Sequence, residues 1–222
     1  MLRAMDRLLE VDLRRAKEYF ESRESISVVK GQLMVLRLDG VSFRTRLNGF
    51  RKPRDERVMA AIETAARELM RGFGAAVAYV VSDEINLFLG EHVPFGSREF
   101  KLTSVSAGIA SAHVSIALGR PLYFDSRIVR LDHGDELPYI VWRARLAAGN
   151  YLSNFARKPF KEAIYMDGIN YLDCCGKVLA RKWIGNKPSR RVIMEYPAID
   201  VIEMWRIPSS TDGYGEKRRG TT

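Results

Sequence analysis

The chain has 222 residues and a mass of 25.3 kDa, and its 46% hydrophobic and 28% charged residues are typical of a globular protein. Its 36 Lys and Arg residues outnumber 27 Asp and Glu residues, and the net charge of +9 favours a polyanionic partner, with nucleic acid first among the candidates. No apolar stretch reaches the roughly 20 residues of a membrane span and no secretory signal is recognisable, so we expect a cytoplasmic protein. The adjacent Cys174 and Cys175 close no disulfide loop, and the three histidines are too scattered to suggest a zinc site.

The N-terminal half of the chain alternates helical and extended patterns. Its hydrophobic spacing predicts a helix, a strand, a helix and two further strands, at residues 6–22, 33–38, 53–73, 75–81 and 85–89. Asp39 and Gly40 end the first strand. The last two strands form a predicted hairpin, and its turn contains Ser82, Asp83 and Glu84.

The C-terminal half adds a helix, a strand, a second helix and a small basic hairpin, at residues 97–118, 122–131, 136–155, 177–183 and 191–194. After the leading helix, the elements therefore begin in the order β-α-β-β-α-β. This order predicts an α+β fold of the split βαβ, ferredoxin-like kind, in which two helices cover one face of an antiparallel sheet. We expect the other face to be open for a ligand, and residues 208–222 to form a disordered tail.

Two acidic positions are predicted to meet in this topology. The first strand lies beside the hairpin strands, so Asp39 and Asp83 converge although they are far apart in sequence. Facing carboxylates repel unless cations lie between them, and oxygen ligands of this kind suit Mg²⁺, which takes its remaining ligands from water and substrate phosphates. The pair therefore predicts phosphoryl chemistry with two magnesium ions.

The segment after the first acid is suited to binding phosphate. Gly40 permits a close approach of the backbone, and the charge of Lys52 can assist. The backbone amides that can cradle a triphosphate belong to Val41, Ser42, Phe43 and Arg44. The chain contains no Walker A, GxGxxG or GxSxG motif, which removes the commoner nucleotide-binding and hydrolase alternatives.

Ordinary structural explanations stay open for each of these features taken alone. Each acidic segment is typical of a simple turn, and the Arg- and Lys-rich segment 44–57 is typical of a solvated surface. Large aromatic residues such as Trp142 and Trp183 usually pack in cores. The prediction of a site depends on the two acidic segments lying at adjacent strand ends.

Six blocks of the sequence together carry a family resemblance: Arg37–Phe43, Phe50–Asp55, Ser82–Glu84, Lys101–Ser106, Phe124–Arg127 and Tyr139–Arg143. In this order they resemble the tRNA-histidine guanylyltransferase family over roughly residues 5 to 200. The resemblance implies a catalytic domain like the palm of forward polymerases over residues 1–135. Residues 136–207 are then a helical and basic-hairpin extension packed on it.

The resemblance also implies a site and an activity. It implies two Mg²⁺ ions held by Asp39, Asp83 and the carbonyl of Gly40, with Glu84 as a supporting acid or as a residue that orients the ligands. It implies that nucleoside triphosphate is bound by Ser82 and by the backbone that follows Asp39. The implied reaction is 3′-to-5′ nucleotide addition to the 5′ end of tRNA. In this reaction ATP or GTP activates the 5′ phosphate, and the 3′-hydroxyl of the incoming nucleotide attacks it.

One departure from the family pattern decides the expected branch. Members that add an extra G to tRNA-histidine carry a His-Ile-Asn-Asn block after the Trp-Arg segment. This chain has Ala148 at the histidine position, and only Asn150 and Asn154 match. It therefore resembles the guanylyltransferase-like branch, which repairs 5′-truncated tRNAs by template-dependent addition. Addition of G to tRNA-histidine stays open as the alternative.

We expect a basic surface of the extension to hold the acceptor stem and 5′ end of tRNA through phosphate contacts. Its predicted residues are Arg143, Arg157, Lys158, Lys161, Arg181, Lys182 and Arg190, with Asn150 and Asn154 beside them. Two other classes stay open: a palm-type nucleotidyl cyclase or primer-extending enzyme that needs no tRNA 5′ end, and a non-catalytic basic module that binds tRNA without Mg²⁺. The resemblance also implies a homo-oligomer, a tetramer built from dimers.

Overall fold

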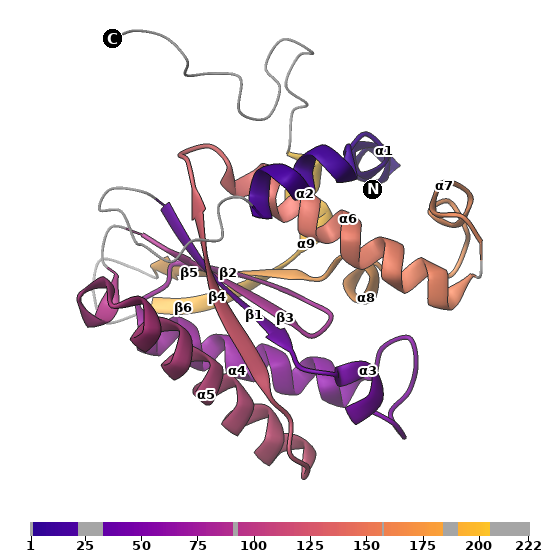
Figure 1. Ribbon diagram of the computed structural model, residues 1–222. Helices are drawn as coiled ribbons and strands as arrows, with labels where there is room; N and C mark the ends of the chain where they lie inside the picture. The colour runs from indigo at the N-terminus through magenta and orange to yellow at the C-terminus, as the bar shows by residue number, and fades with distance from the viewer. Residues whose placement is uncertain (1, 22–32, 91–92, 157, 184–190, 205–222) are drawn as a thin grey trace, which may run out of the picture.

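The computed structural model describes residues 2–21, 33–90, 93–156, 158–183 and 191–204 (Figure 1). These residues are built around an antiparallel sheet with the strand order β4-β1-β3-β2-β5-β6. The strands are β1 (Leu33–Gly40), β2 (Val77–Val81), β3 (Glu84–Leu89), β4 (Phe124–Leu131), β5 (Lys177–Trp183) and β6 (Arg191–Pro197). The predicted disordered tail, 208–222, lies outside the described residues.

The three helices predicted after the leading one are present in the predicted order, and the structure adds short helices that the sequence pattern did not predict. The helices are α1 (Leu2–Leu9), α2 (Leu13–Glu21), α3 (Phe43–Arg46), α4 (Glu56–Phe73), α5 (Glu99–Leu118), α6 (Glu136–Phe155), α7 (Phe160–Ala163), α8 (Tyr171–Cys175) and α9 (Ala198–Glu203), with a 3₁₀ helix at Pro94–Ser97. The first four strands with α4 and α5 form the split βαβ unit. The predicted α+β fold class is therefore confirmed.

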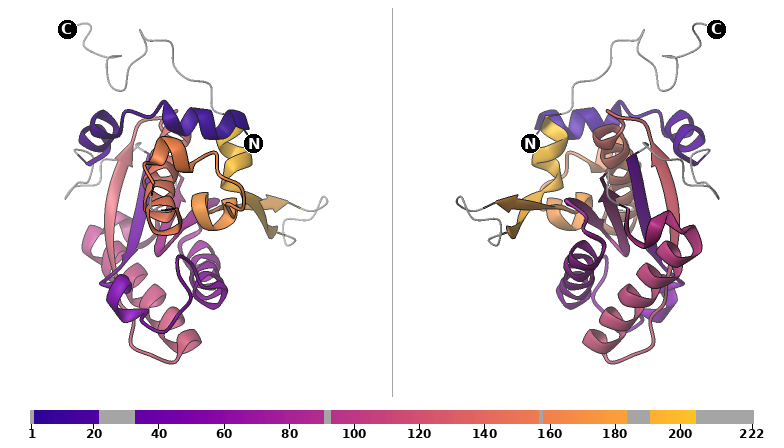
Figure 2. Two further views of the ribbon diagram at one scale, coloured as in Figure 1. Left: turned by 90° about the vertical axis from the view of Figure 1, so that its right-hand side faces the viewer. Right: turned by 90° about the vertical axis from the view of Figure 1, so that its left-hand side faces the viewer.

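Both faces of the sheet are covered by helices (Figures 1 and 2). Leu36 and Leu38 of β1 are buried with α4 and α5. Because side chains alternate along a strand, Val35 points to the opposite face, where it is buried with Tyr139 and Trp142 of α6. The expectation of an open second face was therefore wrong over this part of the sheet, since that face carries apolar residues that α6 removes from water.

The leading helix differs from its prediction. Helices α1 and α2 replace the single helix expected over residues 6–22. The side chain of Asp12 accepts a hydrogen bond from the backbone amide of Arg15 at 3.1 Å, as an N-terminal capping residue does. This cap starts a second helix, and Val11, before it, is buried against the core.

The C-terminal hairpin joins the central sheet rather than forming a separate layer. Strand β5 pairs with β2, so β5 and β6 continue the sheet beyond the split βαβ unit. The outer part of this hairpin projects from the body of the molecule (Figure 2). Gly176, before β5, has a positive φ of 80°, and an added Cβ there would overlap the carbonyl oxygen of Val80. A residue without a side chain is therefore needed where β5 meets β2.

Among the described residues, no helix is both long and apolar enough to cross a membrane.

Candidate nucleotide and metal site

The structure brings the two acidic segments to one edge of the sheet. Asp39 ends β1 between two neighbouring strands, with Glu84 of β3 and Asp125 of β4 as its cross-strand partners. The amide of Gly40 donates a hydrogen bond to the carbonyl oxygen of Asp83 at 3.1 Å. The strand end and the hairpin turn are therefore joined directly through their backbones.

Asp39 lies in a crowded negative environment. Burial is the main reason that its pKa rises from the ordinary 3.8 to about 6, and the charges of Glu84 and Asp83 raise it further. Arg143 acts in the opposite direction, and Asp125 adds a smaller repulsion. Asp125 was not among the predicted site residues, although the antiparallel pairing of the first and fourth strands could have placed it beside Asp39.

Glu84 is committed to an internal ion pair. Its side chain is 6% exposed, and Arg143 donates to it through both Nε, at 2.8 Å, and Nη2. Asn86 Nδ2 donates to the same carboxylate at 2.8 Å. Burial alone would raise the pKa of Glu84, but the charge and hydrogen bonds of Arg143 outweigh it and hold that pKa below its ordinary value. The geometry therefore favours the orienting role over that of a supporting acid.

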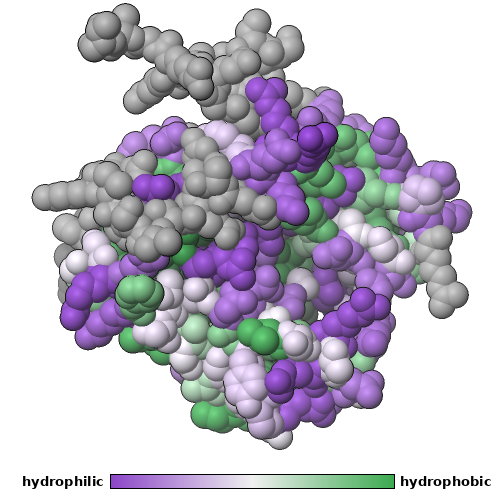
Figure 3. Space-filling view, viewed as in Figure 1, coloured by the Kyte–Doolittle hydropathy of each residue, from purple (hydrophilic) through white to green (hydrophobic). Residues whose placement is uncertain are grey.

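A cavity of about 460 Å³ opens beside the hairpin turn. Its walls are residues between 43 and 59, the turn residues Ser82–Asp83, and Asn150, Ser153 and Asn154 of α6. Hydrophilic atoms gather on this side of the molecule, on the right in Figure 3, between α6 and the segment that includes α3. The cavity therefore lies where the turn, the loop before α4 and the C-terminal half of α6 face one another.

The cavity has a cationic lining. Arg44, Arg51, Lys52 and Arg54 contribute to it, and Asp55 is its second carboxylate besides that of the hairpin turn. Asp55 is already engaged, because it accepts hydrogen bonds from the amide and guanidinium of Arg57 and from the amide of Arg51. The remaining charge is positive and suits a phosphate-bearing ligand.

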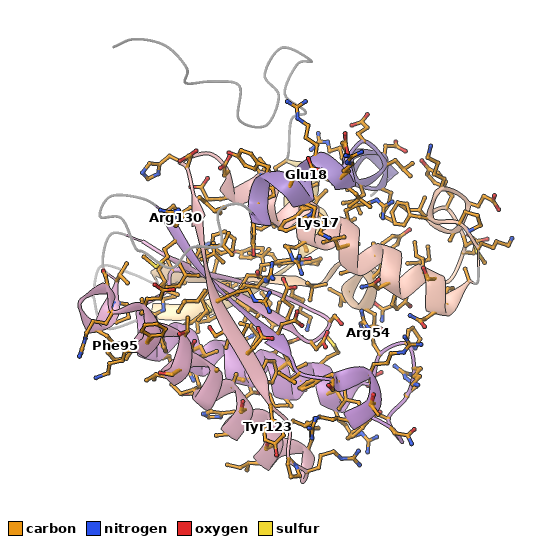
Figure 4. The ribbon with its side chains drawn as sticks, in the orientation of Figure 1. Lys17, Glu18, Arg54, Phe95, Tyr123 and Arg130 are labelled. Carbon is orange, nitrogen blue, oxygen red and sulfur yellow. The ribbon has the colours of Figure 1, made fainter. Side chains whose placement is uncertain are left out.

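Arg54 is a cavity residue that the sequence prediction did not assign to the site. It lies on the loop between α3 and α4, near the helices α6 and α8 (Figure 4). Its Nη1 donates to the carbonyl of Pro53 at 3.0 Å, whereas its buried Nε has no hydrogen-bond partner within the described part of the chain. Burial lowers its pKa from the ordinary value. The Arg-Lys-Pro-Arg run that ends at this residue was the available sequence signal.

The predicted nucleotide-binding residues divide into two groups. Phe43, Arg44, Lys52 and Ser82–Asp83 line the cavity. The amides of the other predicted positions are partly engaged: that of Gly40 by Asp83, and that of Val41 by the carbonyl of Tyr123 at 2.8 Å.

Val41 therefore does not contribute a free amide to the predicted phosphate cradle. Ser42, with a φ of 59°, precedes the first turn of α3, where Phe43 and Arg44 follow. The first amides of a helix have no partner within the helix, so the amides of these three residues stay candidates for the predicted cradle.

The predicted tRNA-binding residues are dispersed. Asn150 and Asn154 line the cavity, and Lys158 and Lys161 are exposed beyond α6. Arg143 does not lie on this surface, because its side chain is only 14% exposed and is paired with Glu84.

The hairpin cations lie away from the cavity. The guanidinium of Arg181 donates to the carbonyl of Met70, and its backbone amide donates to the carbonyl of Ala76. Ala76 precedes β2, at the end of that strand opposite the hairpin turn. Lys182 follows Arg181 and is exposed. Arg157 and Arg190 lie outside the described residues. Arg143 and Arg181 are therefore engaged within the protein, at separate places, and the predicted contacts with tRNA stay predictions.

Few side chains are available to hold a metal ion. Within the described residues, no group of three or more His, Cys, Asp or Glu side chains is placed to bind one. Asp39 nevertheless lies close enough to Asp83 for the two carboxylates to repel each other, and burial together with this repulsion raises the pKa of Asp39. The Gly40 amide, next to Asp39, donates to the Asp83 carbonyl oxygen. Mg²⁺ commonly uses only one or two protein carboxylates and takes water and phosphate as its other ligands. The donor set fits Mg²⁺ on this basis.

Residues 14–132 match the family model described as tRNAHis guanylyltransferase, which is more than half of the chain. The chain belongs to the tRNA-histidine guanylyltransferase family. This family consists of nucleotidyltransferases that act on tRNA. The predicted family resemblance is confirmed, and five of its six sequence blocks lie within the matched residues.

Solved structures of guanylyltransferase-like proteins share the fold. A bacterial tRNA(His) guanylyltransferase (Thg1)-like protein in complex with GTP has a TM-score of 0.68 and 24% identity, covering 82% of this chain and 89% of that one. The corresponding complex with ATP has a TM-score of 0.70 and 22% identity, covering 85% and 93%. The tRNA(His) guanylyltransferase of Saccharomyces cerevisiae has a TM-score of 0.58 and 16% identity, covering 78% and 93%.

A curated sequence relative matches over a shorter part of the chain. An uncharacterized protein of Acanthamoeba polyphaga mimivirus is 23% identical over 160 residues, which are 56% of this chain and 55% of that protein. The match thus spans about half the length of this relative.

Proposed function

We propose that this protein adds nucleotides in the 3′-to-5′ direction to the 5′ end of tRNA. Family membership supplies the class of reaction. The observation that carries the proposal is the junction of Asp39 with the Ser82–Asp83 turn beside a cavity lined by cations. A net charge of +9 supports a polyanionic substrate.

In this proposal Asp39, Asp83 and the carbonyl of Gly40 hold two Mg²⁺ ions. When bound, such ions lower the pKa of an attacking hydroxyl and neutralise a leaving pyrophosphate. Asp83 is oriented for ligation by Ser82, whose hydroxyl donates to its Oδ1 at 2.7 Å. Arg143 prevents the neighbouring Glu84 from adding an uncompensated charge.

The cavity is the proposed nucleotide-binding site. The amides at the start of α3, from Ser42 to Arg44, hold the triphosphate, and the side chains of Lys52 and Arg54 neutralise its charge. ATP or GTP bound here activates the 5′ phosphate of tRNA by transferring its nucleoside monophosphate to it, with release of pyrophosphate. The 3′-hydroxyl of the incoming nucleotide then attacks the activated phosphate, loses its proton and displaces the nucleoside monophosphate. Solved relatives named as complexes with ATP and GTP agree with this choice of ligands.

We further propose the template-dependent repair activity, with addition of G to tRNA-histidine as the alternative. Ala148 occupies the position of the family histidine and is buried in the core, so it presents no polar group to a nucleotide. Asn150, Ser153 and Asn154 are the polar residues of α6 that line the cavity. The base of the added nucleotide is then chosen by pairing with the opposite RNA strand.

Incubation of a 5′-truncated tRNA and a full-length tRNA-histidine with each of the four labelled nucleotides tests the proposal. We expect addition only of the base that pairs with the 3′ strand, in the presence of Mg²⁺ and ATP. Addition of G regardless of the opposing base in the 3′ strand would contradict the repair activity and support addition of G to tRNA-histidine. Binding of tRNA with no nucleotide addition in any reaction would support a non-catalytic module, and the Asp39→Asn variant controls for contaminating activity.

The assembly and domain division are part of the same proposal. Family resemblance supports a cytoplasmic homotetramer, with residues 1–135 as the palm-like unit and 136–207 as its extension. Light scattering at micromolar concentration tests the assembly, and a monomer would contradict it.

A further inference from the structure

One face of α6 contacts both the acidic strand end and the cavity. Arg143, Asn150 and Asn154 are separated by seven and four residues, a spacing that places them on the same side of a helix. Arg143 reaches Glu84 on β3, and the two asparagines line the cavity opposite Ser82–Asp83. The position of α6 therefore affects both parts of the proposed site.

A buried hydrogen-bond network fixes this position. Tyr139 Oη donates to Asn86 Oδ1 at 2.7 Å, and Asn86 Nδ2 donates to Glu84 Oε1 at 2.8 Å. Arg143 donates to the same carboxylate through Nε and Nη2. Because Tyr139 and Arg143 are one helical turn apart, these contacts set both the rotation and the depth of α6 against β3.

The ion pair with Glu84 also affects whether Arg143 can pair with Asp39. Arg143 interacts electrostatically with Asp39 as well as with Glu84. If Glu84 lost its charge, the buried guanidinium would lack its partner, and the carboxylate of Asp39 would be its alternative. An Asp39 side chain paired with Arg143 is not available to a cation.

We propose that Glu84 and Arg143 form a positioning pair. Glu84 holds the guanidinium away from Asp39, which keeps that carboxylate available for a divalent cation, and the same contact directs Asn150 and Asn154 toward the cavity. This role rests on the proposed metal-dependent function. Neither residue is a metal ligand or an RNA contact in it.

Binding of Mn²⁺, measured by electron paramagnetic resonance without nucleotide or tRNA, tests the pair. We expect Glu84→Gln to weaken Mn²⁺ binding at least about tenfold, as loss of a residue that orients metal ligands does. The double variant Glu84→Gln with Arg143→Met removes both charges and restores most of the affinity. A residue that acts only through folding predicts no such rescue, since the double variant then loses more contacts than the single one.

Two controls separate the possible failures. Asp39→Asn defines non-specific Mn²⁺ binding, and wild type that binds no better than this variant would refute both the metal site and the pair. Wild type that binds specifically, with a double variant that stays as weak as Glu84→Gln, would overturn the positioning pair alone.

A conservative variant protects the test against unfolding. Thermal unfolding is recorded for each protein. Arg143→Lys keeps the charge but loses the bidentate geometry, and we expect it to retain Mn²⁺ affinity while raising KM for tRNA through a shifted α6. An unchanged KM in a folded Arg143→Lys protein contradicts the second half of the proposal.

Discussion

The amide of Gly40 donates a hydrogen bond to the carbonyl oxygen of Asp83 at 3.1 Å, which links the end of β1 to the turn between β2 and β3. Two positions that are remote in sequence are therefore held together by backbone geometry. Because Asp39 precedes Gly40, this contact also brings the carboxylates of Asp39 and Asp83 close enough to interact. The proposed metal chemistry depends on it.

Replacement of either acid by its amide tests this arrangement directly. We expect Asp39→Asn or Asp83→Asn to lower kcat for nucleotide addition at least about 100-fold, because each removes a proposed cation ligand. Affinity for tRNA, measured by filter binding, should change little. Activity within a few-fold of wild type in both variants would show that these carboxylates have no catalytic role.

The raised pKa of Asp39 predicts that the same substitution stabilises the protein in the absence of metal. The folded-state pKa is about 6 and the ordinary value is 3.8, so ionised Asp39 costs stability as pH rises through 6. In a chelator at pH 7.5, Asp39→Asn should gain on the order of 1–3 kcal/mol in the free energy of unfolding.

The gain should shrink between pH 6 and pH 4 and vanish below pH 4, where the wild-type carboxyl is protonated in both states. Urea unfolding at these pH values measures it. An equal gain at every pH would assign the effect to packing rather than to charge.

A side chain at Gly40 should disturb the loop that enters α3. A Cβ at this position would lie 2.5 to 2.7 Å from atoms of the Phe43 ring, which is itself packed edge-on against Phe124. We expect Gly40→Ala to raise KM for the nucleotide about tenfold by moving the start of α3, because a buried ring cannot move without cost.

Gly72 provides the matched control, since a Cβ there meets no atom within 4 Å among the described residues. Gly72→Ala should leave KM unchanged and stabilise α4 slightly. Equal KM values for wild type and Gly40→Ala would show that the loop does not contact the nucleotide.

Arg54 should contribute to nucleotide binding through its charge. We expect Arg54→Met to weaken ATP binding about tenfold in isothermal titration, because a half-buried cation that faces phosphate makes strong charge-assisted hydrogen bonds. Arg71→Met is the control, since Arg71 is exposed and pairs with Glu68 on α4. A similar loss in both variants would indicate a general effect of net charge.

The sequence established the local elements and their order with good accuracy. Helix α6 begins and ends at the predicted residues, and α4 ends before Gly74, whose φ of 72° makes it a helix terminus that the pattern anticipated. Periodicity reports such features well because they depend on neighbours along the chain. The convergence of Asp39 with the hairpin turn also followed, since element order restricts the possible strand pairings.

Only the tertiary structure determined how charged side chains are paired. Nothing in the sequence distinguishes Arg143 and Arg181 from arginines on the surface. In the structure, however, Arg143 is paired with Glu84, and Arg181 donates to the carbonyl of Met70. The positions of Arg54 in the cavity wall and of Asp125 beside Asp39 were likewise seen only in the structure. The sequence was enough to predict that acidic residues lie at the ends of adjacent strands. Folding fixed which cation neutralises which acid, because that depends on distances of a few ångströms between elements far apart along the chain.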